Sequence, residues 1–244
     1  MKCVILAAGY ATRLYPLTEN FPKPLLTVGD KTILDWLLED INGSGVVDEY
    51  IVISNHKFAH LFQDWADTHH LPITVVDDGT ETNQTRLGAV RDIQFAIEKQ
   101  NLNDDLLVIA GDNLLDFSLT GFIDYFQAKK TTVIMCYWEE SEAKLRKTGV
   151  AVVDENDKIL EMEEKPAEPK SHWCTPPFYI YKALDVPLVE KGIDAGCGVD
   201  APGSFIAWLS KQTTVHAWKM PGRRYDIGNL ESYEEVKKNY RGIR

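Results

Sequence analysis

The sequence has few cysteines, and their spacing gives them no shared role. Four occur in 244 residues, at Cys3, Cys136, Cys174 and Cys197, and no two have the spacing of a metal-binding pair. Three of them stand in apolar or strand-like stretches, where free thiols usually pack as small hydrophobic residues. This pattern predicts reduced thiols and a cytoplasmic protein.

Basic residues are also in the minority. Lys and Arg together number 26, against 37 Asp and Glu, which gives a formal net charge of −11. An acidic chain of this kind does not favour nucleic acid or an anionic membrane surface as a partner. Any basic residues that bind an anionic ligand are therefore expected at one small site and not over a broad surface.

Long hydrophobic runs and low-complexity segments are absent too. The opening run MKCVILAAG has a single lysine and is broken at Gly9, and no later run approaches the length of a membrane helix. No linker-like stretch divides the chain, so we expect one domain over residues 1–244.

The sequence does contain, near its start, an apolar run followed by a glycine and a proline-rich loop. The apolar run from Cys3 to Ala8 predicts a buried central strand, and Gly9 allows a tight turn and the close approach of a ligand. Arg13 and Lys23 follow in a loop stiffened by three prolines. A stiff loop with backbone N–H groups, one guanidinium and one ammonium suits a triphosphate, although an ordinary turn with surface cations is the alternative.

Residues 6–26, LAAGYATRLYPLTENFPKPLL, resemble the signature loop of the sugar-1-phosphate nucleotidyltransferases, the nucleoside diphosphate sugar pyrophosphorylases. Ala11 departs from that pattern, because the family usually has a glycine there, and alanine is less suited to a positive φ. The resemblance implies that this stretch binds the nucleotide through Leu6, Ala7, Ala8, Gly9, Thr12 and Arg13.

Strand and helix patterns alternate after this loop. Helical spacing runs from Lys31 to Ser44 and from Phe58 to Thr68, and short β-branched strands are expected at 50–53 and 73–76. This alternation predicts an α/β fold with a doubly wound, mostly parallel sheet, the Rossmann-like fold that the resemblance also implies. The loops after Ala8, Val76 and Ala110 should then face one cleft.

The polar loop from Asp77 to Leu87 leads into a helix near Gly88. In the family this region contacts the nucleobase, and the resemblance therefore implies nucleotide binding by Asn83, Thr85 and Gly88, with Gln84 as a further candidate. A solvated loop that feeds a helix cap is the alternative. Arg86 has no role that the sequence assigns.

Two aspartates are candidate metal ligands. Asp112 follows the apolar strand 106–110 and Gly111, where a carboxylate could bind a cation that bridges phosphate oxygens or could simply cap a turn. The stretch GRRYDIGN resembles the family's second metal motif, and a buried turn carboxylate is the alternative for Asp226. The resemblance implies Mg²⁺ on Asp112 and Asp226, and Lys23, Arg13 and Asp112 as the catalytic residues.

Short strands at 149–153 and 159–162, joined by DENDK, predict a small antiparallel excursion. Residues 139–181 are expected to form part of the acceptor-binding subregion. The EEKP that follows resembles the family's sugar-phosphate clamp and implies acceptor binding by Gly149, Glu164 and Lys165; a solvated strand edge is the alternative. Pro177 stands where the family commonly has a glycine, so the acceptor pocket is expected to differ from the glucose type.

The resemblance implies transfer of a nucleotidyl group from a nucleoside triphosphate to a sugar-1-phosphate, with release of pyrophosphate. A cytidylyltransferase acting on a phosphorylated amino alcohol is one alternative, and a non-catalytic regulatory homologue that binds nucleotide sugar is another. A glycosyltransferase of similar fold is disfavoured, because GDN offers one carboxylate after its strand instead of an Asp-x-Asp pair. A homo-oligomer is possible, and the base and the sugar are not fixed by the sequence.

Overall fold

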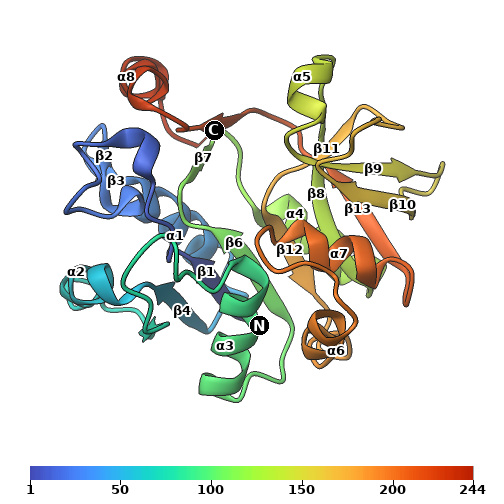
Figure 1. Cartoon of the computed structure of the whole chain (residues 1–244), viewed down its shortest axis with the longest axis horizontal. Helices are drawn as coiled ribbons and strands as arrows, with labels where there is room; N and C mark the ends of the chain where they lie inside the picture. Colours follow the sequence, from blue (N-terminus) through green and yellow to red (C-terminus); the bar gives the residue numbers. More distant parts are fainter. Residues whose placement is uncertain (244) are drawn as a thin grey trace. The chain divides into compact units, whose positions relative to one another are not determined.

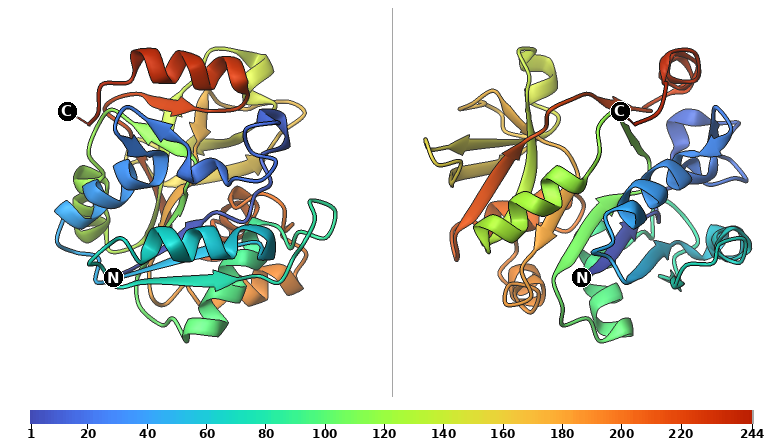
Figure 2. Two further views of the ribbon diagram at one scale, coloured as in Figure 1. Left: turned by 90° about the vertical axis from the view of Figure 1, so that its left-hand side faces the viewer. Right: turned by 180° about the vertical axis from the view of Figure 1, so that it is seen from behind.

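The computed structural model describes residues 1–243 and has the expected α/β class. It folds into two compact units (Figures 1 and 2). Unit 1 comprises Met1–Arg86, Ala110–Gly121 and the segment from Pro221, and unit 2 comprises Leu87–Ile109 and Phe122–Met220. The single domain expected from the sequence stays a prediction.

Unit 1 contains a parallel sheet, two small two-stranded sheets and three α-helices. Its elements are β1 (Lys2–Leu6), the 3₁₀ turns η1 (Thr12–Leu14) and η2 (Lys23–Leu25), β2 (Thr27–Val28), β3 (Lys31–Thr32), α1 (Ile33–Gly43), β4 (Glu49–Ser54), α2 (His56–Ala66), β5 (Ile73–Asp77), β7 (Asn113–Leu115), β14 (Arg224–Asp226) and α8 (Leu230–Asn239).

The parallel sheet of unit 1 consists of β1, β4 and β5, with β4 in the middle. Cys3, Val4 and Ile5 of β1 are completely buried, which accounts for the continuous apolar run in the sequence. The helices between the strands begin at polar caps: Thr32 and Asp35 form a capping box at α1, and the Asn55 side chain accepts from Phe58 N–H at α2. These caps fix where each strand ends and its helix begins.

A hydrophobic cluster ties the C-terminal helix to the rest of unit 1. Tyr233 and Val236 of α8 pack with Leu14 of the signature loop, Leu114 of β7 and Ile227, which follows β14. The strands β7 and β14 pair antiparallel in a register that sets Asn113 opposite Asp226. Burial of this cluster therefore holds the segments that carry both candidate metal aspartates.

Unit 2 contains the remaining elements, except that the last residue of β6 and the first two residues of α4 belong to unit 1. They are α3 (Ala89–Gln100), β6 (Leu106–Ala110), α4 (Thr120–Lys129), β8 (Thr132–Trp138), α5 (Glu142–Leu145), β9 (Gly149–Val153), β10 (Ile159–Glu164), β11 (Trp173–Thr175), β12 (Phe178–Tyr181), α6 (Leu188–Asp194), α7 (Gly203–Leu209) and β13 (Val215–Lys219).

The antiparallel pairing in the sheet of unit 2 comes from the predicted excursion. Strand β9 pairs with β10 and β11, β11 also pairs with β8, and β12 pairs with β6 and β8, all antiparallel. Each of these pairs includes a strand from within 139–181, whereas β13 runs parallel to β8. The expected excursion is therefore confirmed, and it lies entirely in unit 2.

Two smaller expectations can also be checked. The four cysteines are free thiols, and Cys3, Cys136 and Cys174 are buried as expected of small hydrophobic residues. In the part of the chain that the structure describes, no helix has the length and the apolar composition needed to cross a membrane.

Candidate active site

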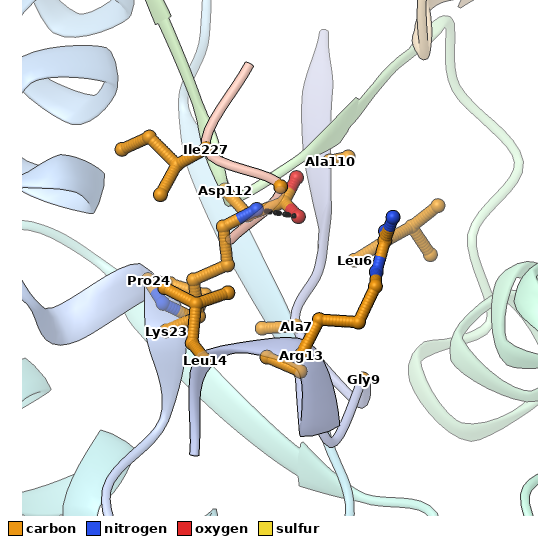
Figure 3. Close-up of a pocket in the computed structure, with 12 residues that line it drawn as sticks. Leu6, Ala7, Gly9, Arg13, Leu14, Lys23, Pro24, Ala110, Asp112 and Ile227 are labelled. Carbon is orange, nitrogen blue, oxygen red and sulfur yellow. Dashed lines mark hydrogen bonds and ion pairs between the residues drawn. The ribbon is translucent and has the colours of Figure 1, made fainter. Parts of the chain in front are cut away.

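A pocket with a cavity of about 170 Å³ lies in unit 1 at the carboxyl end of β1 (Figure 3). Six of the predicted site residues line it, and they come from the strand, the signature loop and the segment after β6. They are Leu6, Ala7, Gly9, Arg13, Lys23 and Asp112. The remaining lining residues are Ala11, Leu14, Pro24, Ala110, Ile227 and Gly228.

Backbone hydrogen bonds fix the strand ends that form the pocket floor. The N–H of Ala7 donates to the carbonyl of Ile53 at 2.9 Å, and the N–H of Gly111 donates to the carbonyl of Leu6 at 3.0 Å. The side chain of Asn55 donates to the carbonyl of Ala8 at 2.9 Å. The loops after Ala8 and Ala110 therefore meet as predicted, whereas no described residue of the loop after Val76 lines this pocket.

Ala11 adopts the left-handed conformation, with φ 45° and ψ 41°. This is the conformation that the family's usual glycine would adopt more easily, because a Cβ atom is strained there. The turn is held in place by Thr18, whose buried hydroxyl donates to the Ala11 carbonyl at 2.8 Å. Ala11 therefore takes up the left-handed turn despite its Cβ atom.

Lys23 and Asp112 form the polar centre of the pocket. The ammonium of Lys23 donates to Oδ2 of Asp112 at 2.8 Å, as Figure 3 shows. Burial alone would raise the pKa of Asp112, but the charge and the hydrogen bond of Lys23, with a further contribution from Arg224, hold that pKa below its ordinary value. The Asp112 carboxyl is thus held in its ionised form.

Arg13 supplies a second cation to the same pocket. Its side chain is exposed, and Nη1 lies 4.0 Å from the position that a Cβ atom on Gly228 would occupy. A Cβ atom at 228 would therefore be in ordinary van der Waals contact with the guanidinium. Arg13 and Lys23 together give the pocket two positive groups with different geometries, a planar fork and a point charge.

The donor set fits a hard divalent cation that also binds substrate. Asp112 and Asp226 offer carboxylate oxygens, and no cluster of three or more histidine, cysteine or acidic side chains suited to a metal occurs among residues 1–243. Mg²⁺ is typically held by one or two carboxylates, with waters and phosphate oxygens completing its shell. Two protein carboxylates are therefore a sufficient protein contribution to a site of this kind.

Several predicted residues of unit 1 lie outside the pocket lining. They are Ala8, Thr12, Asn83, Thr85 and Asp226. The hydroxyl of Thr85 is engaged with Thr82 in a local turn, and Arg86 donates to the carbonyl of Asn83 at 2.9 Å. Arg86, to which the sequence assigned no role, thus braces this loop. Nucleotide binding by Asn83 and Thr85 stays a prediction.

Gly88, in unit 2, has a conformational reason to be glycine. Its φ is +91°, and a Cβ atom there would lie 2.5 Å from the carbonyl oxygen of Val199. The N–H of Val90 donates to that same oxygen at 3.0 Å, so the backbone of the 199–200 segment docks onto the start of α3. A contact of Gly88 with a nucleobase stays a prediction.

A second polar group in unit 2 contains the predicted acceptor residues. Gly149 stands opposite Glu164 on β10 and opposite Thr175 on β11, so all three share one face of the sheet. A Cβ atom on Gly149 would lie 2.2 Å from Thr175 Oγ1, and one on Gly203 would lie 2.2 Å from Glu164 Oε2. Two glycines therefore make the space that Glu164 occupies.

The pKa of the Glu164 carboxyl is raised, which favours its neutral form. Burial raises its pKa, Lys165 lowers it in part, and the nearby charge of Asp200 raises it further. Thr175 Oγ1 is buried and has no hydrogen-bond partner in the described chain. Lys165 is exposed and has a positive φ of 51°, with its N–H bonded to the Thr148 carbonyl.

A comparison of the sequence with protein-family models matches residues 2–242 to the family described as nucleotidyl transferase. The chain belongs to the nucleotidyl transferase family. The match spans both units, and the resemblance found in the signature loop is confirmed.

Curated members of this family are similar along most of the chain. The bifunctional protein GlmU of Methanocaldococcus jannaschii is 30% identical over 93% of the chain, which covers 51% of that protein. A UTP–glucose-1-phosphate uridylyltransferase of a Synechocystis species is 26% identical over 96% of the chain, which covers 61% of that protein. The chain thus spans between half and two thirds of the length of these relatives.

Solved structures have the same fold. A UDP-glucose pyrophosphorylase complexed with UDP-glucose superposes with a TM-score of 0.81 at 20% identity, and the match covers 98% of this chain and 97% of the other. At that identity the likeness shows the fold, and the mostly parallel Rossmann-like α/β class predicted from the sequence is confirmed.

Two polar residues that connect to Asp112 through hydrogen bonds were not singled out from the sequence. Asn113 is 2% exposed and donates from Nδ2 to Oδ1 of Asp112 at 2.8 Å. Arg224 donates from Nη1 to Oδ1 of Asn113 at 2.6 Å. The sequence offered one signal for each: Asn113 directly follows Asp112, and Arg224 stands two residues before Asp226.

Proposed function

We propose that this nucleotidyl transferase transfers the nucleotidyl group of a nucleoside triphosphate to a sugar-1-phosphate and releases pyrophosphate. The observation that carries the proposal is the convergence of Arg13, Lys23 and Asp112 on one pocket at the end of a buried parallel strand. Two cations and an ionised carboxylate beside loop backbone are what a triphosphate and its cation require.

In this reaction an oxygen of the acceptor phosphate attacks the α-phosphorus, and the bond from that phosphorus to the bridging oxygen of pyrophosphate breaks. The electron pair leaves with pyrophosphate, so the chain needs to supply no nucleophile. Its task is to align two anions and to neutralise charge. Lys23 would act on the α-phosphate, and Arg13 with the loop amides would hold the rest of the triphosphate.

A divalent cation, Mg²⁺ in this proposal, would neutralise phosphate charge when bound. Asp112 and Asp226 are the residues that would hold it. Lys23 occupies Oδ2 of Asp112 in the structure, and Asn113 occupies Oδ1. Asp226 is accessible, with 64% of its side chain exposed.

The residues of unit 2 would bind the acceptor. Glu164 would accept hydrogen bonds from the acceptor's hydroxyl groups, Gly149 would leave room for them, and Lys165 would neutralise the acceptor phosphate. A cytoplasmic location and a possible homo-oligomer complete the proposal. Pro177 supports one further candidate, transfer of a cytidylyl group to a phosphorylated amino alcohol, because a proline in place of the family's glycine changes that pocket.

One experiment tests the function and separates these candidates. Pyrophosphate release is measured with each of four nucleoside triphosphates against a panel of sugar-1-phosphates and phosphorylated amino alcohols, with and without excess chelator. We expect turnover with at least one sugar-1-phosphate and none in chelator. Turnover only with an amino alcohol phosphate would establish the second candidate, and nucleotide-sugar binding without turnover would establish the regulatory homologue.

A further inference from the structure

Strand β14 presents two different pairs of side chains to its two sides. Side chains alternate along a strand, so Arg224 and Asp226 share one face while Arg223 and Tyr225 share the other. The guanidinium of Arg223 accordingly lies over the Tyr225 ring, 4.9 Å from its centroid. The register of β14 with β7 sets Asn113 opposite Asp226, which brings Asn113 onto the face of Arg224.

On this face a chain of polar contacts connects the two candidate metal aspartates. Arg224 donates to Oδ1 of Asn113 at 2.6 Å, and Nδ2 of Asn113 donates to Oδ1 of Asp112 at 2.8 Å. Arg224 Nη1 also lies 3.8 Å from Oδ1 of Asp226, a loose ion pair. All of these residues belong to unit 1.

The chemistry of the contacts fixes the orientation of the Asn113 amide. A guanidinium has only donors and therefore pairs with the amide oxygen, whereas a carboxylate has only acceptors and therefore pairs with the amide nitrogen. With Arg224 on one side and Asp112 on the other, one amide orientation satisfies both partners. Asn113 is 2% exposed, and an unmatched amide would be costly at that depth.

We propose that Arg224 is a positioning residue of the cation site: through Asn113 it orients the Asp112 carboxylate, and its charge steadies Asp226. This inference rests on the proposed function, because the cation is the one that the transfer reaction would use. By holding Asn113 on Oδ1 of Asp112, Arg224 leaves Oδ2 as the oxygen that faces Lys23 in the pocket. Outer partners of this kind are typical of metal sites, where they orient the ligands.

The sign of one binding measurement separates positioning from simple electrostatics. Removing a positive charge beside two carboxylates should by itself strengthen cation binding. Losing the guanidinium that fixes the Asn113 amide on Asp112 should weaken cation binding, by roughly 10-fold or more if Arg224 acts as outer partners usually do. A weakening in a variant that has lost the charge therefore reports the positioning role.

The experiment measures Mn²⁺ binding by the loss of the free-ion paramagnetic resonance signal, with and without a non-hydrolysable triphosphate. Arg224→Met removes charge and donors, Arg224→Lys keeps a charged donor, and Arg223→Met is the control on the opposite face. We expect Mn²⁺ binding weaker by about 10-fold in Arg224→Met, partly restored in Arg224→Lys and unchanged in Arg223→Met. At saturating Mn²⁺ the KM for the triphosphate should stay within about twofold in all three.

Unchanged or tighter Mn²⁺ binding in Arg224→Met, or no restoration by lysine, overturns the proposal. If the methionine variant does not fold, Arg224→Gln takes its place, because it too lacks the charge and the same sign is expected. Absence of Mn²⁺ binding by the wild-type chain in both conditions also overturns the inference. Wild-type Mn²⁺ binding without any nucleotidyl transfer would instead contradict the proposed function and leave the Arg224 comparison intact.

Discussion

Lys23 and Asp112 are paired in the pocket of unit 1 through a hydrogen bond of 2.8 Å from Nζ to Oδ2. The lysine side chain is 7% exposed and the aspartate side chain 39%, so the ammonium is the more deeply enclosed partner. A buried ammonium needs such a partner, because an unpaired charge at this depth would be strongly unfavourable. This one contact therefore joins the lysine that we propose binds phosphate to the aspartate that we propose binds the divalent cation.

The first prediction concerns activity. Lys23→Met should lower kcat/KM at least about 100-fold, because loss of a charge on the reacting phosphate costs on the order of 3 kcal/mol. The matched control is Lys31→Met, which removes a lysine that pairs with Glu39 away from the pocket. Steady-state pyrophosphate release measures both variants, and activity of Lys23→Met within about fivefold of wild type would contradict the role.

The second prediction concerns competition for Asp112. Because Lys23 donates to Oδ2, its ammonium competes with a divalent cation for that oxygen. Lys23→Met should therefore bind Mn²⁺ more tightly than wild type when no nucleotide is present, although it turns over more slowly. Titration followed by paramagnetic resonance measures the affinity. Equal or weaker Mn²⁺ binding in Lys23→Met would show that Lys23 does not compete with the cation for Asp112.

The signature loop, the strand ends and the antiparallel excursion could all be predicted from the sequence, because they depend on local pattern. Cys3–Ala8 is apolar because β1 is covered, and Asp112 follows a strand, which places it at the sheet edge. Arg224 and Asn113 could not be predicted in the same way. Their roles depend on the register of β14 against β7, two short strands about a hundred residues apart in the chain.

Gly203 shows the same limit in unit 2. Nothing in its neighbouring sequence, a short helix after a turn, indicates that its missing Cβ makes space for Glu164. The predicted reason for Gly88 was a nucleobase, whereas the structure provides a backbone reason, the approach of Val199. Local sequence patterns therefore do not predict close approaches between segments that are distant in the sequence.

The third prediction follows from the backbone at Gly88. Gly88→Ala should lower the free energy of unfolding by about 1 to 3 kcal/mol, because the residue has φ +91° and the new Cβ would lie 2.5 Å from a carbonyl oxygen. Gly43→Ala is the control, since Gly43 has no neighbour within 4 Å of a built Cβ. Urea denaturation compares the two, and equal stability of both variants would refute the structural reason for Gly88.

The fourth prediction concerns pH. Burial, with the charge of Asp200, raises the pKa of Glu164, so its carboxylate is lost at a higher pH than for an exposed glutamate. If the carboxylate binds the acceptor, the KM for the acceptor should rise as pH falls through that raised pKa, while the KM for the triphosphate does not follow it. Glu164→Gln should abolish this pH dependence; a retained profile would assign it to another group.

The same shift has a consequence for stability with a definite sign. The folded chain binds the Glu164 proton more tightly than the unfolded chain does, since the folded pKa is the higher one. Stability should therefore fall as pH rises from the ordinary glutamate pKa through the raised folded value. Denaturation of wild type and Glu164→Gln over that range checks the sign, and the variant should lose this part of the pH dependence.

The last prediction tests whether Gly203 acts through Glu164. A Cβ atom at 203 would lie 2.2 Å from Glu164 Oε2 and 3.2 Å from Met162 Cε, both at the ends of flexible side chains, and the Gly203 backbone does not require glycine. Gly203→Ala should therefore fold normally but displace the carboxylate and raise the acceptor KM, leaving the triphosphate KM unchanged.

A double-mutant cycle decides the matter, because residues that act through one contact are not additive. The acceptor KM of the double variant Gly203→Ala with Glu164→Gln should be no higher than that of Glu164→Gln alone. The effect of the alanine is then already contained in the loss of the carboxylate. Additive effects would mean that Gly203 influences the acceptor without Glu164, and an unchanged acceptor KM in Gly203→Ala would remove this face of the sheet from acceptor binding.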